Sequence, residues 1–346
     1  MARLTGAPVV VRAPRPSDGR LLADLWRVLW DAHEAWGSYA GSRDLAVYAE
    51  VARRLSEDAH IRGGHPLLGR HMHLVASLEG KVVGQVEGWI DRHGIDPKTP
   101  VTCEVRSLVV AEEARRSGAG RALLETLANV ALDASGGAPT VLAAEVLENN
   151  PARAFYARLG FHTAAHCARM PVARALDVGG SVDFVARIAV PEDALPLALL
   201  ESALAERRRA MGDLRFDRPR SLDAVQVDAI ALHVGRWPRA PHEAAELVVV
   251  DRRNVPRGSA TLSTAALEQP FLPGIRALLA RFALDRAYPP SLLVPPLVRL
   301  AGRLSRLVGA AQLELVDLPA PASAIHEAIL EAGASPWSRV VEKMVV

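Results

Sequence analysis

The chain has 346 residues, of which 50% are hydrophobic and 23% charged, and its formal net charge is +2. This length predicts two domains, each large enough to bury its own core. The nearly balanced charge favours neither nucleic acid nor an anionic membrane as a partner. We expect a cytoplasmic location, because no apolar run is long enough to span a bilayer and the N-terminus lacks the apolar segment of a signal peptide.

The first half of the chain alternates strand-like and helical patterns, which predicts an α/β fold with a mixed sheet. Leu21, Leu22, Leu25 and Leu29 recur at helical spacing after a turn that ends at Asp18. The full set of expected elements is a strand at 9–11, helices following Asp18 and at 46–61, a hairpin over 74–90, strands at 101–110 and 140–146, a helix at 151–159 and a strand at 161–170.

Histidines and cysteines do not form a convincing metal site. His65, His71 and His73 lie close together, but the last two would share one face of a strand and no cysteine or carboxylate cluster completes a ligand set. We therefore expect no metal. Cys103 and Cys167 are too few for a disulfide framework and are predicted to be small core residues.

A glycine loop joins the strand ending at Val110 to a helical run that begins near Arg121. Unpaired backbone N–H groups at a helix start and its positive dipole attract anions, and glycines allow a close approach to the main chain. The loop lacks the lysine of a nucleotide-triphosphate loop and the third glycine of a dinucleotide fingerprint. The sequence therefore predicts a cradle for another phosphate ligand, built from Arg115, Arg116, Ser117, Gly118, Ala119, Gly120 and Arg121.

Two motifs resemble those of the GNAT superfamily of acyl-CoA-dependent N-acyltransferases. Arg115, Gly118 and Gly120 match the signature Arg/Gln-x-x-Gly-x-Gly/Ala, and the second motif is Asn149-x-x-Ala152-x-x-Phe155-Tyr156-x-x-Leu159-Gly160-Phe161. The resemblance implies a GNAT fold. It also implies acetyl-CoA as co-substrate and direct transfer of the acetyl group to a primary amine of a small molecule or peptide.

The resemblance also implies roles for individual residues. Leu108, Val109 and Val110 would present backbone groups to pantetheine, in the gap where strands 101–110 and 140–146 separate. Tyr156 would donate a proton to the departing thiolate, and Asn149 would bind pantetheine or cap the following helix. Glu104 stands where some relatives carry a general base; it could instead bind the acceptor amine as a counter-ion or have a structural role.

Aromatic residues follow the first helix. Trp26 and Trp30 are expected in the core, whereas Gly37 and Gly41 place Trp36 and Tyr39 in a loop. In the resembling family this region borders the acceptor groove, so Trp36 and Tyr39 are candidates for substrate contact.

The pattern Arg12-x-x-x-Pro16-x-Asp18 recurs as Arg187-x-x-x-Pro191-x-Asp193, and further pairs follow at offsets of about 173 to 175 residues. We expect two copies of one fold, an N-terminal catalytic domain over 1–180 and a degenerate, non-catalytic domain over 181–346. In the second copy the loop reads Arg286 to Ser291 with two prolines, which remove N–H donors, and Ile329 stands where Tyr156 does. The predicted assembly is a pseudo-dimeric monomer or a homodimer.

Two alternatives to a simple acetyltransferase are open. Tandem acetyltransferases that resemble mycothiol synthase also carry two such domains, although their working domain is the second. A non-catalytic acetyl-CoA sensor or scaffold would need neither Glu104 nor Tyr156. The sequence does not identify the amine acceptor.

Overall fold

The computed structural model describes residues 8–62, 71–91, 101–136, 138–216, 223–224, 227, 244–267, 270–320 and 323–345. His65 lies outside these residues. The chain divides into two compact units. The first consists of Met1–His162, Glu268–Leu272 and Val341–Val346, and the second of Thr163–Leu267 and Pro273–Val340.

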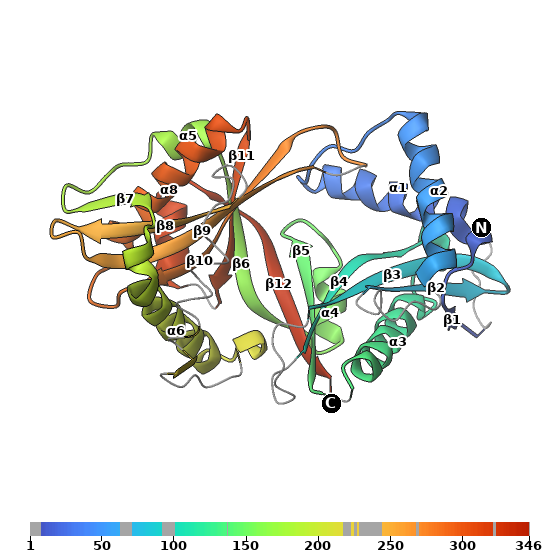
Figure 1. Cartoon of the computed structure of the whole chain (residues 1–346). Helices are drawn as coiled ribbons and strands as arrows, with labels where there is room; N and C mark the ends of the chain where they lie inside the picture. Colours follow the sequence, from blue (N-terminus) through green and yellow to red (C-terminus); the bar gives the residue numbers. More distant parts are fainter. Residues whose placement is uncertain are drawn as a thin grey trace. The chain divides into compact units, whose positions relative to one another are not determined.

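The first unit is a mixed sheet with helices on both faces (Figure 1). Its strand order is β1-β2-β3-β4-β5-β12, with β1 to β4 antiparallel and β4 parallel to β5. The strands are β1 (Val10–Arg12), β2 (His71–Leu78), β3 (Lys81–Asp91), β4 (Val101–Val110), β5 (Thr140–Leu147) and β12 (Ser335–Val345), whose residues from Val341 onward belong to this unit.

The helices of the first unit form where the apolar periodicity predicts them. They are α1 (Gly19–Ala35), α2 (Leu45–Arg62), α3 (Ala119–Ala134) and α4 (Arg153–Arg158), with short 3-10 turns η1 (Pro16–Asp18) and η2 (Glu112–Ala114). The buried stripe of α3, including Leu123 and Leu127, packs on one face of the sheet, and the stripe of α1, including Leu22, packs on the other. Both faces of the sheet are therefore covered.

The second unit repeats this plan with the strand order β6-β11-β10-β9-β8-β7. Its strands are β6 (His162–Pro171, from Thr163 in this unit), β7 (Phe184–Ile188), β8 (Ala244–Asp251), β9 (Pro256–Ala266), β10 (Ile275–Leu284) and β11 (Gln312–Pro319). Its helical elements are α5 (Val172–Leu176), η3 (Pro191–Asp193), α6 (Ala194–Ala210), η4 (Leu214–Phe216), α8 (Pro290–Leu307) and α9 (Ala324–Glu331).

The recurring Arg-x-x-x-Pro-x-Asp pattern forms the same structure twice. Arg12 Nη1 donates to Asp18 Oδ2 at 2.7 Å, and Arg187 Nη1 donates to Asp193 Oδ2 at 2.6 Å. Each aspartate also accepts the backbone N–H of the residue three positions earlier, at 2.7 and 2.8 Å. Each ion pair thus ties a strand, β1 or β7, to the turn that begins the following helix, α1 or α6.

The compact units differ from the predicted division at Gly180. Residues 163–180 belong to the second unit and residues 341–346 to the first. β6 pairs antiparallel with β11, with Met170 opposite Leu313, so the strand after the second motif completes the sheet of the other copy. A boundary read from repeat offsets misses this exchange, because backbone hydrogen bonds between distant strands leave no local sequence pattern.

Candidate active site

A cavity of about 640 Å³ opens in the first unit between α1, the C-terminal half of β4, the start of α3, β5 and α4. Of the predicted site residues, those that line it are Trp36, Leu108, Val109, Val110, Arg115, Arg116, Gly118, Ala119, Gly120, Arg121 and Tyr156. The cavity thus unites the glycine loop with the second motif, which are far apart in the sequence.

A bulge in β4 and the separation of β4 from β5 create the cavity. The β4–β5 register runs from Val101 opposite Thr140 to Val105 opposite Ala144. Two residues further along β4 lies Ser107, whose φ of 50° falls in the left-handed region, and the register with β3 shifts there. The backbone after the bulge therefore borders the cavity, as the prediction for Leu108, Val109 and Val110 requires.

The glycine loop ends where the predicted helix begins. Gly118 is the N-cap of α3 with φ 93°, a conformation that favours glycine, and its carbonyl accepts the N–H of Ala122 at 3.0 Å. Gly120 packs closely on α4, since a Cβ there would lie 3.2 Å from Phe155 Cζ and the ring would have to shift slightly. Ser117 does not line the cavity within the described part of the chain; its Oγ accepts the Ala119 N–H at 3.3 Å.

Positive charge gathers at this end of the cavity. Four exposed arginines line it, namely Arg115, Arg116, Arg121 and Arg158. Together with the positive end of the α3 dipole, they suit a ligand that carries several phosphates.

Tyr156 lies on α4 with only 6% of its surface exposed, and its ring packs edge-on against Phe155 and Phe161, with centroids 5.6 and 5.2 Å apart. Burial raises the pKa of Tyr156 above its ordinary value. The side chain therefore remains a neutral phenol at neutral pH and can donate a hydrogen bond into the cavity that it lines.

The N-cap of α4 is Ala152, without a side-chain cap, and the side chain that bonds the preceding turn is that of Asn150. Asn150 Oδ1 accepts the N–H of Ala152 at 2.9 Å just before α4, and Asn150 lines the cavity. Asn149 is exposed and is not among the described residues around the cavity. The sequence motif located the turn correctly, but which of two adjacent asparagines faces the backbone depends on the turn geometry.

Glu104 lies outside the cavity among the residues that the structure describes. Its carboxylate is exposed and accepts Arg106 Nε at 2.8 Å. It comes before the β4 bulge, whereas the cavity-lining part of the strand begins at Val105.

The two aromatic candidates separate in the structure. Trp36 lines the cavity from the end of α1. Tyr39 is not among the described lining residues; its ring packs against Phe271, with centroids 6.1 Å apart.

Sequence reasoning missed two titratable residues that line the cavity, His33 on α1 and Glu145 on β5. The structure of the flanking elements suggests a sequence pattern by which each residue could have been found. His33 follows Leu29 by one helical turn and so continues the apolar stripe of α1, and Glu145 is the one exposed residue in a strand that is otherwise buried.

Residues 26–161 match the model of the acetyltransferase (GNAT) family. They form a GNAT acetyltransferase domain. The two sequence motifs, the β4 bulge and the glycine loop all lie inside this match, so the predicted family and fold are confirmed.

Solved structures extend the likeness across the chain. A GCN5-related N-acetyltransferase from Sphaerobacter thermophilus is 14% identical with a TM-score of 0.59, over 98% of this chain and 97% of that one. A glucosamine N-acetyltransferase region of a fungal β-N-acetylglucosaminidase is 12% identical with a TM-score of 0.53, over 98% of this chain and 38% of that one. A tandem GNAT protein from the clavulanic acid pathway is 19% identical with a TM-score of 0.48, over 98% of both chains. No curated protein sequence is significantly similar.

Two searches of the described residues bear on other classes of function. None of their helices is long and apolar enough to cross a membrane. No group of three or more His, Cys, Asp or Glu side chains among them could hold a metal ion. His71 and His73 are buried near Glu87, at 3.6 and 3.9 Å from its Oε1, and Cys103 and Cys167 are buried free thiols.

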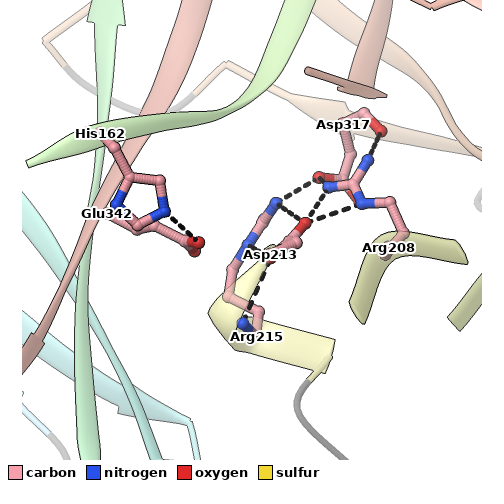
Figure 2. A network of polar contacts seen from close by, with 6 residues as sticks. All are labelled: His162, Arg208, Asp213, Arg215, Asp317 and Glu342. Atoms are coloured by element: carbon pink, nitrogen blue, oxygen red, sulfur yellow. Dashed lines mark hydrogen bonds and ion pairs between the residues drawn. The ribbon is translucent and has the colours of Figure 1, made fainter. Parts of the chain in front are cut away.

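The second unit has an ion network at the corresponding place (Figure 2). Counted from the equivalent aspartates Asp18 and Asp193, His33 of α1 corresponds to Arg208 at the end of α6. Arg208 is 1% exposed and donates to Asp213 Oδ2 at 2.7 Å and to Asp317 Oδ1 at 2.8 Å. Arg215 Nη2 contacts the same two carboxylates, at 3.0 and 2.9 Å. The counterpart of His33 is thus a buried arginine paired with two carboxylates, one of them on β11.

The start of α8 departs from the cradle of the GNAT domain as predicted from its prolines. Pro289 is the N-cap of α8 and Pro290 its first residue, so this helix start lacks N–H groups that an anion would need. Ile329, at the position of Tyr156, is fully buried and apolar.

Proposed function

We propose that the first unit transfers an acetyl group from acetyl-CoA to a primary amine. The observation that carries this proposal is a single cavity that joins the arginine-rich start of α3, the gap between β4 and β5 and the buried phenol of Tyr156. The arginine-rich helix start suits the phosphates of CoA, and the gap between the strands suits its pantetheine arm. The phenol of Tyr156 suits the thioester sulfur. We also propose that the second unit is non-catalytic, because side chains and prolines occupy its equivalent places.

The reaction requires that the amine nitrogen lose two protons and that the departing sulfur gain one. An aliphatic ammonium group, with a pKa of about 10.4, must lose a proton before its nitrogen can attack the thioester carbonyl. As the C–N bond forms and the C–S bond breaks, sulfur leaves with the electron pair as a thiolate. Tyr156 would donate its proton to sulfur and take a second proton from nitrogen, which leaves the amide product with one N–H. Because its pKa is raised, this transfer must be coupled to loss of the nitrogen proton.

Tyr156→Phe is expected to retain acetyl-CoA affinity within about twofold and to lower kcat by at least about tenfold, since general acid catalysis typically contributes factors of about 10² to 10⁴. Calorimetric titration and thiol release would measure the two quantities. Tyr48→Phe is a matched control, because Tyr48 lies on α2 and donates to Asp24 outside the cavity. An unchanged kcat in Tyr156→Phe would remove this side chain from the reaction.

The proposed function is tested by acetyl-CoA-dependent thiol release with a panel of amines: 2-phenylethylamine, spermidine, glucosamine and a lysine peptide. We expect turnover with at least one amine, with the acetylated product confirmed by mass spectrometry, and one acetyl-CoA site per chain by calorimetry. Binding without any acetylated product would favour a sensor. Two sites per chain would assign acetyl-CoA binding to the second unit as well.

A further inference from the structure

His33 is the group in the cavity best placed to take a proton from an acceptor. It lies in the last turn of α1, lines the cavity, and packs its ring against Trp36 with centroids 5.5 Å apart. Burial lowers the pKa of His33 below its ordinary value, so the imidazole is neutral at neutral pH. A neutral imidazole has one nitrogen free to accept a proton.

The other charged or titratable groups around the cavity are unsuited to this task. Tyr156 is a protonated phenol, and burial raises its pKa further, so it cannot accept a proton. Arginines at 115, 116, 121 and 158 are permanently protonated donors. Glu145 is an exposed residue on β5, and a carboxylate is in general a weaker base than imidazole. On α1 itself, Asp31 and Glu34 both pair with Arg43.

The second unit supplies an internal check of this geometry. Arg208, the counterpart of His33, reaches Asp317 of β11 at 2.8 Å. Asp317 lies two residues after Leu315, the last residue of β11 in register with β10, and Glu145 lies one residue after Ala144, the last residue of β5 in register with β4. In both units, therefore, the end of the first helix and a carboxylate of the diverging strand lie around the same space. In the second unit a cationic side chain occupies it.

The walls beside His33 indicate what kind of amine fits. Val28, Leu29, Ala32 and Trp36 line the cavity along α1, so the helix presents an apolar and aromatic wall with one imidazole. Such a wall favours an apolar or aromatic group carrying a single ammonium over a polycation, whose further charges it would desolvate without a partner.

We propose that His33 accepts the proton of the acceptor's ammonium, with Glu145 as the carboxylate that attracts this cation, and that the acceptor is a primary amine on an apolar or aromatic group packed against Trp36 and Leu29. This inference rests on the proposed function of the same cavity. One ammonium proton passes to His33, the nitrogen lone pair forms the C–N bond, and the C–S bond breaks as described above. His33 then releases its proton to solvent.

The test uses the full chain, 2-phenylethylamine and spermidine as acceptors, and the variants His33→Gln, Glu104→Gln and His162→Gln. For the wild type, kcat/KM with 2-phenylethylamine is expected to rise with pH through an apparent pKa below the usual histidine value of about 6.5, because the protonated imidazole cannot accept a proton. His33→Gln is expected to bind acetyl-CoA normally and to have a kcat/KM about 10²-fold lower at neutral pH. Its pH profile is expected to lack the acid limb, which is the rise of kcat/KM through the pKa of His33.

His162→Gln is the matched control. His162 belongs to the same unit, bonds to Glu342 at 3.1 Å (Figure 2) and lies outside the cavity, so its replacement is expected to leave the pH profile unchanged. An unaltered profile in His33→Gln, or loss of the acid limb in Glu104→Gln instead, would overturn the role of His33. Preference for spermidine over 2-phenylethylamine would overturn the acceptor class.

Failure of the proposed function has a separate signature, which is no acetylation of any amine by the wild-type protein. The placement of His33 is then decided by NMR of its imidazole in the CoA-saturated protein, assigned by comparison with His33→Gln. A shift of the His33 signal on addition of 2-phenylethylamine is expected, and an unmoved signal would overturn the inference.

Discussion

Gly118→Val is expected to weaken acetyl-CoA binding by at least about 100-fold, equivalent to about 2.7 kcal/mol. Gly118 has φ 93°, and a Cβ at this position would meet no protein atom within 4 Å. Gly118 lines the cavity, so the added side chain would take up space at the helix start where the phosphates are proposed to bind. Calorimetric titration of acetyl-CoA into the full chain measures the effect.

The matched control for this loss is Gly136→Val. Gly136 follows the other end of α3, has φ 71° and likewise has open space around its Cβ position, but is not among the described lining residues. Both substitutions impose the same kind of backbone strain, of about 1–3 kcal/mol. Only Gly118→Val is expected to lose the ligand. Equal affinity in the two folded variants would contradict the phosphate cradle.

Asp317→Asn is expected to destabilise the second unit by about 3 kcal/mol, the usual scale for removing one partner of a buried ion pair. The change leaves the guanidinium of Arg208, which is 1% exposed, with Asp213 as its remaining carboxylate partner, and removes a partner of Arg215 (Figure 2). Urea denaturation, with attention to the transition of the second unit, measures the loss. A free energy of unfolding equal to that of the wild type would contradict a stabilising role for the network.

The pH dependence of this variant provides a second readout. Burial by itself would raise the pKa of Asp317, but Arg215 and Arg208 lower it below its ordinary value. A carboxyl group with a depressed folded-state pKa stabilises the fold above its unfolded pKa of about 3.9 and loses that contribution as the pH falls. The difference between wild type and Asp317→Asn should therefore shrink on acidification. Asp183→Asn, which removes an exposed pair with Arg252 at 2.7 Å, should cost at most about 1 kcal/mol at any pH.

The bulge in β4 shows why a correct strand prediction does not give the direction in which each side chain of the strand points. Strict alternation would put Cys103, Val105 and Val109 on one face of the sheet. In the structure Cys103 and Val105 pack in the core that includes α3, whereas Val109 packs in the core that includes α1. The extra residue at Ser107 reverses the faces. The relation of Glu104 to the cavity-lining residues after the bulge could therefore not be read from its spacing.

The sequence by itself determined the family, the tandem repeat, the elements of the first unit and the glycine loop. These features depend on local physics, namely helical and strand periodicity, capping, and the left-handed conformation that glycine adopts at Gly118. Only the tertiary structure decided that His33 and Glu145 share a cavity with Tyr156, that Glu104 does not, and that the final strands are exchanged between the units. Those facts depend on strand bulges, strand pairing and helix packing between residues far apart in the chain, which no local pattern records.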